Sequence, residues 1–183
     1  MKKGYTVTYQ MRRQQRQRRD QILRYLLKFI AVVAAAFLLV RFVCSSYTIQ
    51  GDSMSPALEA GEKHLVNRLI YKVKKQDRYD MIVFKLDDKK NQNFYVKRIV
   101  GLPGEKIQIK NGRIYVNGRK TKNFSDEKIL SPGLASDEIV LKSGQYFVIG
   151  DNCNNSEDSR SANIGNVKKE NIIGKVSLKY WPW

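Results

Sequence analysis

The chain has 183 residues, which is enough for one domain with an anchor but not for two full domains. Lysine and arginine number 34 against 17 acidic residues, so the formal net charge is +17. The excess is uneven, because residues 1–44 hold ten Lys/Arg and one acid, Asp20. One histidine and two cysteines, without metal-ligand spacing, predict no metal site and no disulfide framework.

Residues 1–21 are predicted to form a basic cytoplasmic segment. Five arginines lie between Met11 and Arg19, and basic arms of this kind bind nucleic-acid phosphates in other proteins. Here the arginines are followed directly by the apolar segment at 22–44. We therefore predict no nucleic-acid partner.

The apolar segment at 22–44 is predicted to be a transmembrane helix. Its uninterrupted apolar part, Phe29–Val40, is too short to cross about 30 Å of hydrocarbon. Lys28 and Arg41 bound it, and their long side chains can reach the lipid headgroups. With these residues as boundaries, 23–43 is long enough to span.

The position of the basic residues predicts the topology. They lie mainly before the apolar segment, so the positive-inside rule places the N-terminus in the cytoplasm and residues 45–183 outside the cell membrane. The alternative is a cleavable signal peptide cut after the alanines at 34–36. Apolar residues continue past these alanines, which favours a retained anchor.

Residues 45–183 have the pattern of a mainly β fold. Short apolar or alternating runs are separated by Gly, Asn, Asp or Pro, and no amphipathic helix of three turns is evident. Asn111-Gly112 suits a two-residue hairpin turn with positive φ. We therefore predict an antiparallel β-sandwich or partly open barrel, with an irregular loop at 124–136. The expected strands are Tyr47–Ile49, His64–Tyr71, Met81–Phe84, Phe94–Val100, Lys106–Ile109, Arg113–Val116, Glu138–Leu141, Tyr146–Ile149 and Lys175–Tyr180.

Ser53 lies in a turn bounded by Gly51 and Pro56. The glycine allows close backbone approach, and the proline prevents a strand from continuing. Such a turn presents a hydroxyl next to backbone N–H groups, as an oxyanion hole requires. Gly-Asp-Ser is also ordinary turn material, so this segment alone does not distinguish a nucleophile from a polar turn.

Lys97 lies in an apolar strand, on the same face as Tyr95 and Ile99. It can act as a base near neutral pH only if its pKa falls by roughly 2–3 units, which burial without a carboxylate partner can supply. Because His64 is the only histidine, Lys97 is the candidate base for Ser53. The alternative is a lysine that reaches solvent at a sheet edge.

Residues 150–160 follow an apolar strand and are rich in Asn, Asp and Ser, which suit side-chain-to-backbone hydrogen bonds. No glutamate stands at EF-hand spacing, so we predict no calcium site.

Four segments occur in a fixed order: Gly-x-Ser-Met-x-Pro at 51–56, Asp-Met-Ile-Val-Phe at 80–84, Lys-Arg-Ile-Val-Gly-Leu-Pro-Gly at 97–104, and Gly-Asp-Asn followed by Ser-x-Asp-Ser-Arg at 150–160. This order resembles the four consecutive motifs of type I signal peptidases. The small size and single apolar segment resemble the short Gram-positive members. The resemblance implies a membrane-anchored serine endopeptidase that removes N-terminal signal peptides from exported preproteins, without a metal or organic cofactor.

The resemblance also implies roles for particular residues. Ser53 would be the nucleophile and Lys97 the general base, while Ser156 would orient the lysine amine. The backbone N–H of Ser53 would serve the oxyanion, with Gly51 standing where some members carry a second donor.

Two ion pairs are expected to support the site. Arg98 would pair with Asp151, and Asp158 with Arg160. Cys153 stands where family members usually carry arginine, and we expect that difference to affect the stiffness of the loop rather than catalysis.

The same resemblance implies shallow apolar pockets for small side chains at positions −1 and −3 of the signal peptide. The residues expected to line them are Ile49, Met54, Leu58, Tyr95 and Val96. The expected partners are preprotein signal peptides and membrane lipids, with the secretion translocon or pilin precursors as further candidates.

Two other functions were weighed against this one. Some relatives of the family act as pilus-assembly factors, and a dyad enzyme dedicated to pilin precursors is the main alternative. A Ser/Lys self-cleaving repressor shares the dyad and a β-rich domain, but a membrane segment at 22–44 opposes a DNA-binding N-terminus.

Overall fold

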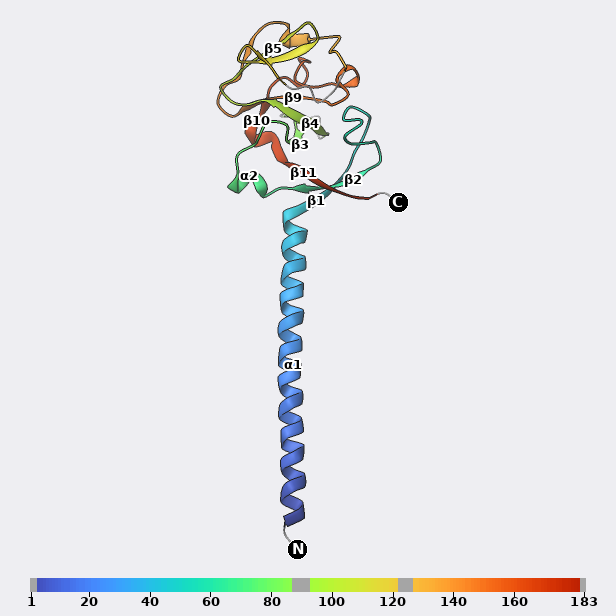
Figure 1. The fold of residues 1–183 in the computed structure, drawn as a ribbon, viewed down its shortest axis with the longest axis vertical. Helices are drawn as coiled ribbons and strands as arrows, with labels where there is room; N and C mark the ends of the chain where they lie inside the picture. The colour runs from blue at the N-terminus through green and yellow to red at the C-terminus, as the bar shows by residue number, and fades with distance from the viewer. Residues whose placement is uncertain (1–2, 87–92, 122–126, 182–183) are drawn as a thin grey trace. The chain divides into compact units, whose positions relative to one another are not determined.

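A computed structural model describes residues 3–86, 93–121 and 127–181, and it describes side chains at 17–37, 45–86, 93–121 and 127–177 (Figure 1). The chain divides into two units, Met1–Val43 and Cys44–Trp183. The first unit contains helix α1 (Lys3–Val43). The second contains a short helix and all of the strands.

Helix α1 runs without interruption because no glycine or proline lies between Tyr5 and Val43, and much of its length is Ala, Leu, Arg and Gln. Its described side chains, at 17–37, are exposed, including large apolar ones such as Phe29 at 66% and Phe37 at 69%. Within the described part of the chain, no helix combines the length and apolarity needed to cross a membrane. The predicted transmembrane segment at 22–44 extends into 38–44, whose side chains lie outside the described residues.

The second unit is built from two antiparallel sheets. The larger has seven strands in the order β1-β2-β11-β3-β4-β9-β10, and the smaller has four in the order β7-β6-β5-β8. Figure 1 shows the strands succeeding one another from β1 and β2 to β9, with β5 beyond β9. Its edge strands, β1 and β10, do not pair with each other, so the larger sheet is open. The two antiparallel sheets confirm the predicted mainly β, antiparallel fold. The bounds are β1 Cys44–Thr48, β2 Lys63–Asn67, α2 Ile70–Val73, β3 Met81–Lys85, β4 Phe94–Gly101, β5 Lys106–Lys110, β6 Arg113–Val116, β7 Arg119–Lys120, β8 Ile139–Val140, β9 Gln145–Ile149, β10 Val167–Lys168 and β11 Ile172–Trp181.

The strand expected at His64–Tyr71 is wrong at its C-terminal end. Strand β2 stops at Asn67, whose side-chain Oδ1 accepts hydrogen bonds from the backbone N–H groups of Leu69 and Ile70, each 3.0 Å long. These bonds turn the chain into α2, because an asparagine side chain competes with the sheet for backbone donors.

Two Asn-Gly pairs make the hairpins of the smaller sheet. Asn111 and Gly112 have φ of 51° and 72° between β5 and β6, as predicted. Asn117 and Gly118 have φ of 52° and 76° and form a second such turn, between β6 and β7. The strand expected at 138–141 is reduced to β8, and the two-residue strands β7 and β10 were not expected. In the predicted loop at 124–136, residues 124–126 lie outside the described residues, and Gly133–Ser136 form a short 3-10 helix.

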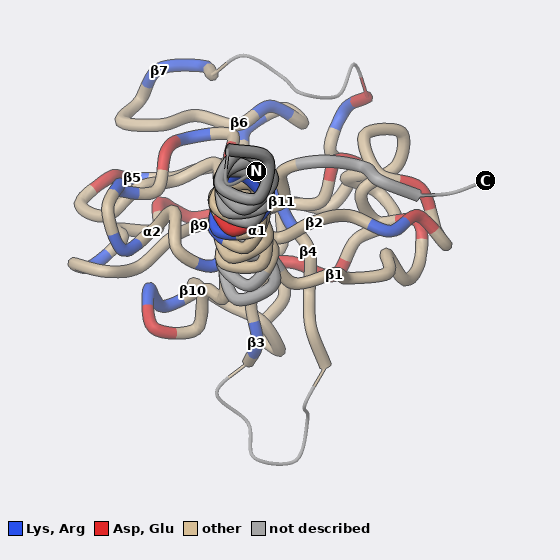
Figure 2. Tube along the Cα trace, turned by 90° about the horizontal axis from the view of Figure 1, so that it is seen from below, with Lys and Arg blue, Asp and Glu red and all other residues tan. Residues whose placement is uncertain are grey.

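Three apolar clusters form the core, and they position the site. One joins the smaller sheet to β4 and β9 through residues such as Ile107 and Phe147. A second covers the face of the larger sheet that carries Ile82 and Ile99. The third lies under the Ser53 turn and contains Met54 and Leu58. Basic and acidic residues are interspersed along the described trace of the second unit rather than gathered in one block (Figure 2).

Candidate active site

The turn that carries Ser53 is fixed by its own backbone and by its neighbours. Gly51 has φ of 74°, a conformation that favours glycine, and the N–H of Ser55 donates to the carbonyl of Asp52 at 3.1 Å. Met54 and Leu58 are 1% and 2% exposed and hold the segment on the core. Ser53 itself is half-buried, so a substrate can reach it while the buried residues that follow it hold the turn in place.

Lys97 meets Ser53 from strand β4. The Lys97 Nζ lies 2.5 Å from Ser53 Oγ, and the lysine is 4% exposed. Burial lowers the pKa of Lys97 to about 8, although the carboxylates of Asp158 and Glu157 act to raise it. At pH 7 a group with that pKa is neutral in about one molecule in ten, and a neutral amine at this distance can accept the Ser53 proton.

Asp158 is the buried carboxylate with the largest charge effect on Lys97, but it is already matched by other partners. Arg160 donates to both of its oxygens at 2.8 Å, and the backbone N–H of Gly150 donates to Oδ2 at 3.1 Å. A carboxylate with these bonds stabilises a charged lysine less than a free one would. A large fraction of the Lys97 amine is therefore neutral at mildly alkaline pH.

The structure places Ser156 beside the same carboxylate. Its hydroxyl donates to Asp158 Oδ2 at 2.9 Å and, among the described residues, makes no hydrogen bond to Lys97. The idea that Ser156 orients the lysine amine stays a prediction.

Gly150 and Asn152, to which the sequence analysis gave no individual role, join this loop to the serine turn. A Cβ on Gly150 would lie 2.3 Å from Ser156 Oγ and 2.4 Å from the Ser53 carbonyl oxygen, so only glycine fits there. The backbone N–H of Asn152 donates to that same carbonyl at 3.1 Å, and its Nδ2 donates to the carbonyl of Asp52 at 3.2 Å. The Gly-Asp-Asn motif was the available signal, but its contact with Ser53 is visible only in three dimensions.

The structure brings together both of the expected ion pairs. Arg98 donates to the two oxygens of Asp151 at 2.7 and 2.5 Å, and its third nitrogen donates to the carbonyl of Tyr79 at 2.9 Å. The second pair is Arg160 with Asp158. Both are bidentate, which fixes orientation as well as charge.

Cys153 lies in the core, although the residues on both sides of it in the sequence are polar. It is 3% exposed and packs in the cluster with Ile107 and Phe147, and burial raises the pKa of its thiol. Arg160 donates to its backbone carbonyl at 2.5 Å. A small side chain therefore suits this position, and the loop is braced by the arginine at 160.

An open cavity of about 900 Å³ lies over the Ser53–Lys97 pair. Of the residues expected to bind substrate, Ile49, Met54, Tyr95 and Val96 line it, whereas Leu58 lies in the core behind it. The described residues contain no group of three or more His, Cys, Asp or Glu placed to hold a metal ion.

A serine hydroxyl against a buried lysine amine, beside a partly apolar cavity, is the arrangement of a serine hydrolase that uses lysine in place of histidine. The chain belongs to the signal peptidase family, peptidase S26, whose family model matches residues 22–181.

Two relatives, from Bacillus caldolyticus and Staphylococcus aureus, agree with this membership. The chain is 41% identical over 169 residues to a signal peptidase I of Bacillus caldolyticus, covering 85% of this chain and 88% of the relative. It is 35% identical over 180 residues to a signal peptidase IB of Staphylococcus aureus, covering 86% and 91%. A solved signal peptidase I from Enterococcus faecalis V583 is 29% identical with a TM-score of 0.46, covering 57% of this chain and 99% of that one.

Proposed function

We propose that this chain is a serine endopeptidase that removes N-terminal signal peptides from exported preproteins, with Ser53 as nucleophile and Lys97 as general base. Family membership supports the activity and the substrate class. The observation that carries the mechanism is the 2.5 Å contact between the buried Lys97 Nζ and Ser53 Oγ. Neither the described structure nor the relatives favour the pilin-dedicated alternative.

Acylation begins when the neutral Lys97 amine takes the proton of the Ser53 hydroxyl as Oγ attacks the scissile carbonyl carbon. The backbone N–H of Ser53 stabilises the developing oxyanion. When the C–N bond breaks, Lys97 returns the proton to the departing amine, which becomes the N-terminus of the mature protein. The signal peptide remains as an ester on Ser53.

Deacylation repeats the exchange with water. Lys97 removes a proton from a water molecule that attacks the ester carbonyl, and the proton then returns to Ser53 Oγ as the ester bond breaks. The backbone N–H of Asn152 holds the Ser53 carbonyl throughout, and the missing side chain of Gly150 lets the two segments approach, so the nucleophile is not displaced between the two steps.

The apolar residues that line the cavity set the substrate preference. Ile49, Met54 and Val96 leave shallow space, which fits Ala, Gly or Ser at −1 and −3. The test is a set of preproteins with Ala, Leu or Phe at −1, incubated with the full-length protein in detergent, followed by sequencing of the new N-terminus. Efficient cleavage after Phe or Leu would contradict the assignment.

We also propose that α1 anchors the enzyme in the cell membrane, with the N-terminus in the cytoplasm. Its apolar side chains at 22–37 are exposed, and water is an unfavourable surrounding for so many of them. The arginines that precede them favour the cytoplasmic side. The full-length protein should stay in the membrane pellet at alkaline pH, and release into the supernatant would contradict a spanning anchor.

A further inference from the structure

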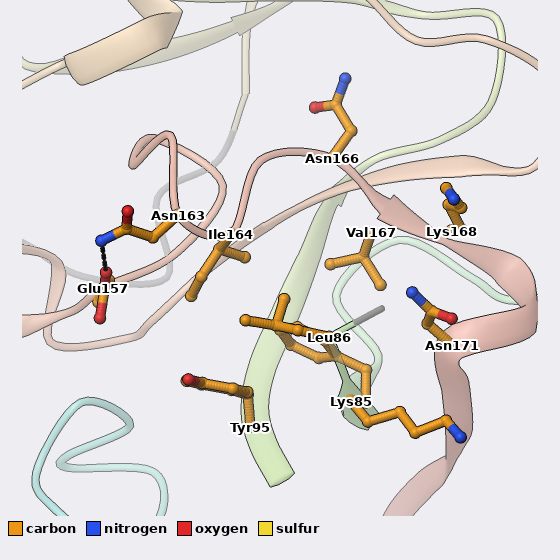
Figure 3. A pocket seen from close by; sticks show the side chains of 11 residues that line it. Lys85, Leu86, Tyr95, Glu157, Asn163, Ile164, Asn166, Val167, Lys168 and Asn171 are labelled. Carbon is orange, nitrogen blue, oxygen red and sulfur yellow. Dashed lines mark hydrogen bonds between the residues drawn. The ribbon is translucent and has the colours of Figure 1, made fainter. Parts of the chain in front are cut away.

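A second pocket, of about 530 Å³, adjoins the catalytic cavity (Figure 3). The two share Tyr95 and Glu157, which line both. Strands β3 and β4 and the chain from Glu157 to Asn171 supply its walls. The steps proposed above for Ser53 and Lys97 do not involve this pocket.

The shared wall stands next to the reacting groups. Tyr95 is two residues from Lys97 on β4, so both side chains lie on the same face of the strand. Glu157 follows Ser156 and is one of the charges that act on Lys97. A peptide that extends past Ser53 on this side therefore passes Tyr95 and Glu157 and enters the second pocket.

The charges of the pocket are separated. Glu157 accepts a hydrogen bond from Asn163 Nδ2 at 2.8 Å, while Lys85 and Lys168 lie on the opposite side of the pocket (Figure 3). Apolar side chains such as Leu86 and Val167 lie between the two ends. Glu157 is the one carboxylate among the described residues that line the pocket, and it already accepts a hydrogen bond, so Lys85 gives the far end of the pocket a positive charge that a ligand can meet.

We propose that this pocket binds the first residues of the mature chain, on the C-terminal side of the scissile bond, and that it favours an acidic side chain there. The inference rests on the proposed function, because the apolar part of the catalytic cavity takes the residues before the cut and leaves this side for those after it. Lys85 pairs with Phe94, which is three residues from Lys97 on β4. Because an extended peptide advances about 3.3 Å per residue, Lys85 lies within reach of roughly the first four mature residues.

The test compares peptides that share one signal sequence and differ only at positions +1 to +4, each carrying Ala, Glu or Lys in turn. At the position that reaches the pocket, the wild-type enzyme should cleave the Glu peptide with a kcat/KM about threefold to fivefold above that of the Lys peptide at low salt. Lys85→Glu should abolish or reverse this ratio. Lys142→Glu, the same charge change at an exposed lysine outside both cavities, should keep the wild-type ratio.

A ratio measured within one enzyme preparation is independent of how much of that preparation is folded. An unchanged ratio in Lys85→Glu, or equal cleavage of the Glu and Lys peptides at every position from +1 to +4, would overturn the proposal. In either case normal cleavage of the Ala peptide by the wild type would leave the proposed function intact. Failure of the wild type to cleave any peptide would instead contradict the proposed function.

Discussion

Lys97 combines burial with a charge balance that leaves it usable as a base. Burial is the main cause that lowers its pKa to about 8, and Arg160 acts in the same direction. Asp158, Glu157 and Asp151 act in the opposite direction. The position of the lysine in an apolar strand predicted the first effect, whereas the balance of the loop charges needed the structure.

The pH dependence of cleavage follows from this pKa. Activity requires the neutral amine, so kcat/KM should rise with pH, reach half of its plateau near the pKa of about 8, and level off above it. The measurement is the cleavage rate of one preprotein between pH 6 and 10. A half-maximum above pH 10 would mean that the lysine is solvated and is not the base.

The same shift predicts that Lys97 destabilises the folded protein at neutral pH. Below pH 8 the lysine is protonated in both the folded and the unfolded chain, and the folded state bears the full penalty of a buried charge. Between pH 8 and 10.5 the folded chain loses the proton first, so the penalty disappears as pH rises. Lys97→Met should therefore raise the free energy of unfolding at pH 7 by about 1–3 kcal/mol.

This gain should shrink towards zero at pH 10.5, which thermal unfolding of both proteins at several pH values can show. Because the comparison subtracts the general effect of alkaline pH on the fold, a gain that is constant with pH would contradict a buried, titrating lysine.

At the scale of elements, the site is a contact between two loops carried by the larger sheet. The turn after β1 holds Ser53, the loop after β9 holds Ser156 and Asp158, and Gly150 is the point at which they touch. Asn152 adds two hydrogen bonds across the same contact. The alignment of Ser53 with Lys97 therefore depends on how closely these loops approach.

Gly150→Ala should separate the loops. The added Cβ would lie 2.4 Å from the Ser53 carbonyl oxygen, so the serine turn must move, and a misplaced nucleophile lowers kcat by about tenfold or more. The matched control is Gly174→Ala, whose Cβ would lie 2.5 Å from the Asn67 carbonyl oxygen, away from the site. We expect the control to lower the melting temperature while keeping kcat per folded molecule. Equal kcat in both variants would show that the loop contact does not align the dyad.

The elements show which structural features follow from sequence patterns. Period-two patterns and the Asn111-Gly112 turn predicted most strands, because side-chain alternation and positive φ are local properties. The end of β2 was missed because Asn67 caps the following turn through its side chain. The burial of Cys153 was missed because its neighbours in the sequence are polar, whereas the apolar residues that surround its thiol, such as Ile107 and Phe147, are distant in the sequence.

At the scale of the whole molecule, the chain couples one long helix to one β unit, and the two are described separately. Family membership, the order of the motifs and the Ser53–Lys97 contact all indicate the same peptidase activity. The role of α1 as an anchor is the part of the account that depends on sequence composition and exposed apolar side chains alone.

The central claim is that Ser53 and Lys97 act as one catalytic unit. The most direct measurement is the initial rate at which the full-length protein in detergent cleaves one preprotein near pH 8, for the wild type, Ser53→Ala, Lys97→Ala and the double variant. Each single change should lower the rate by at least about a thousandfold, and the double variant should be no slower than either, because one residue without the other has no function. Lys97→Arg should be equally inactive, since a guanidinium does not deprotonate. Substantial cleavage by any of these variants, or a double variant whose loss is the product of the two single losses, would contradict the account.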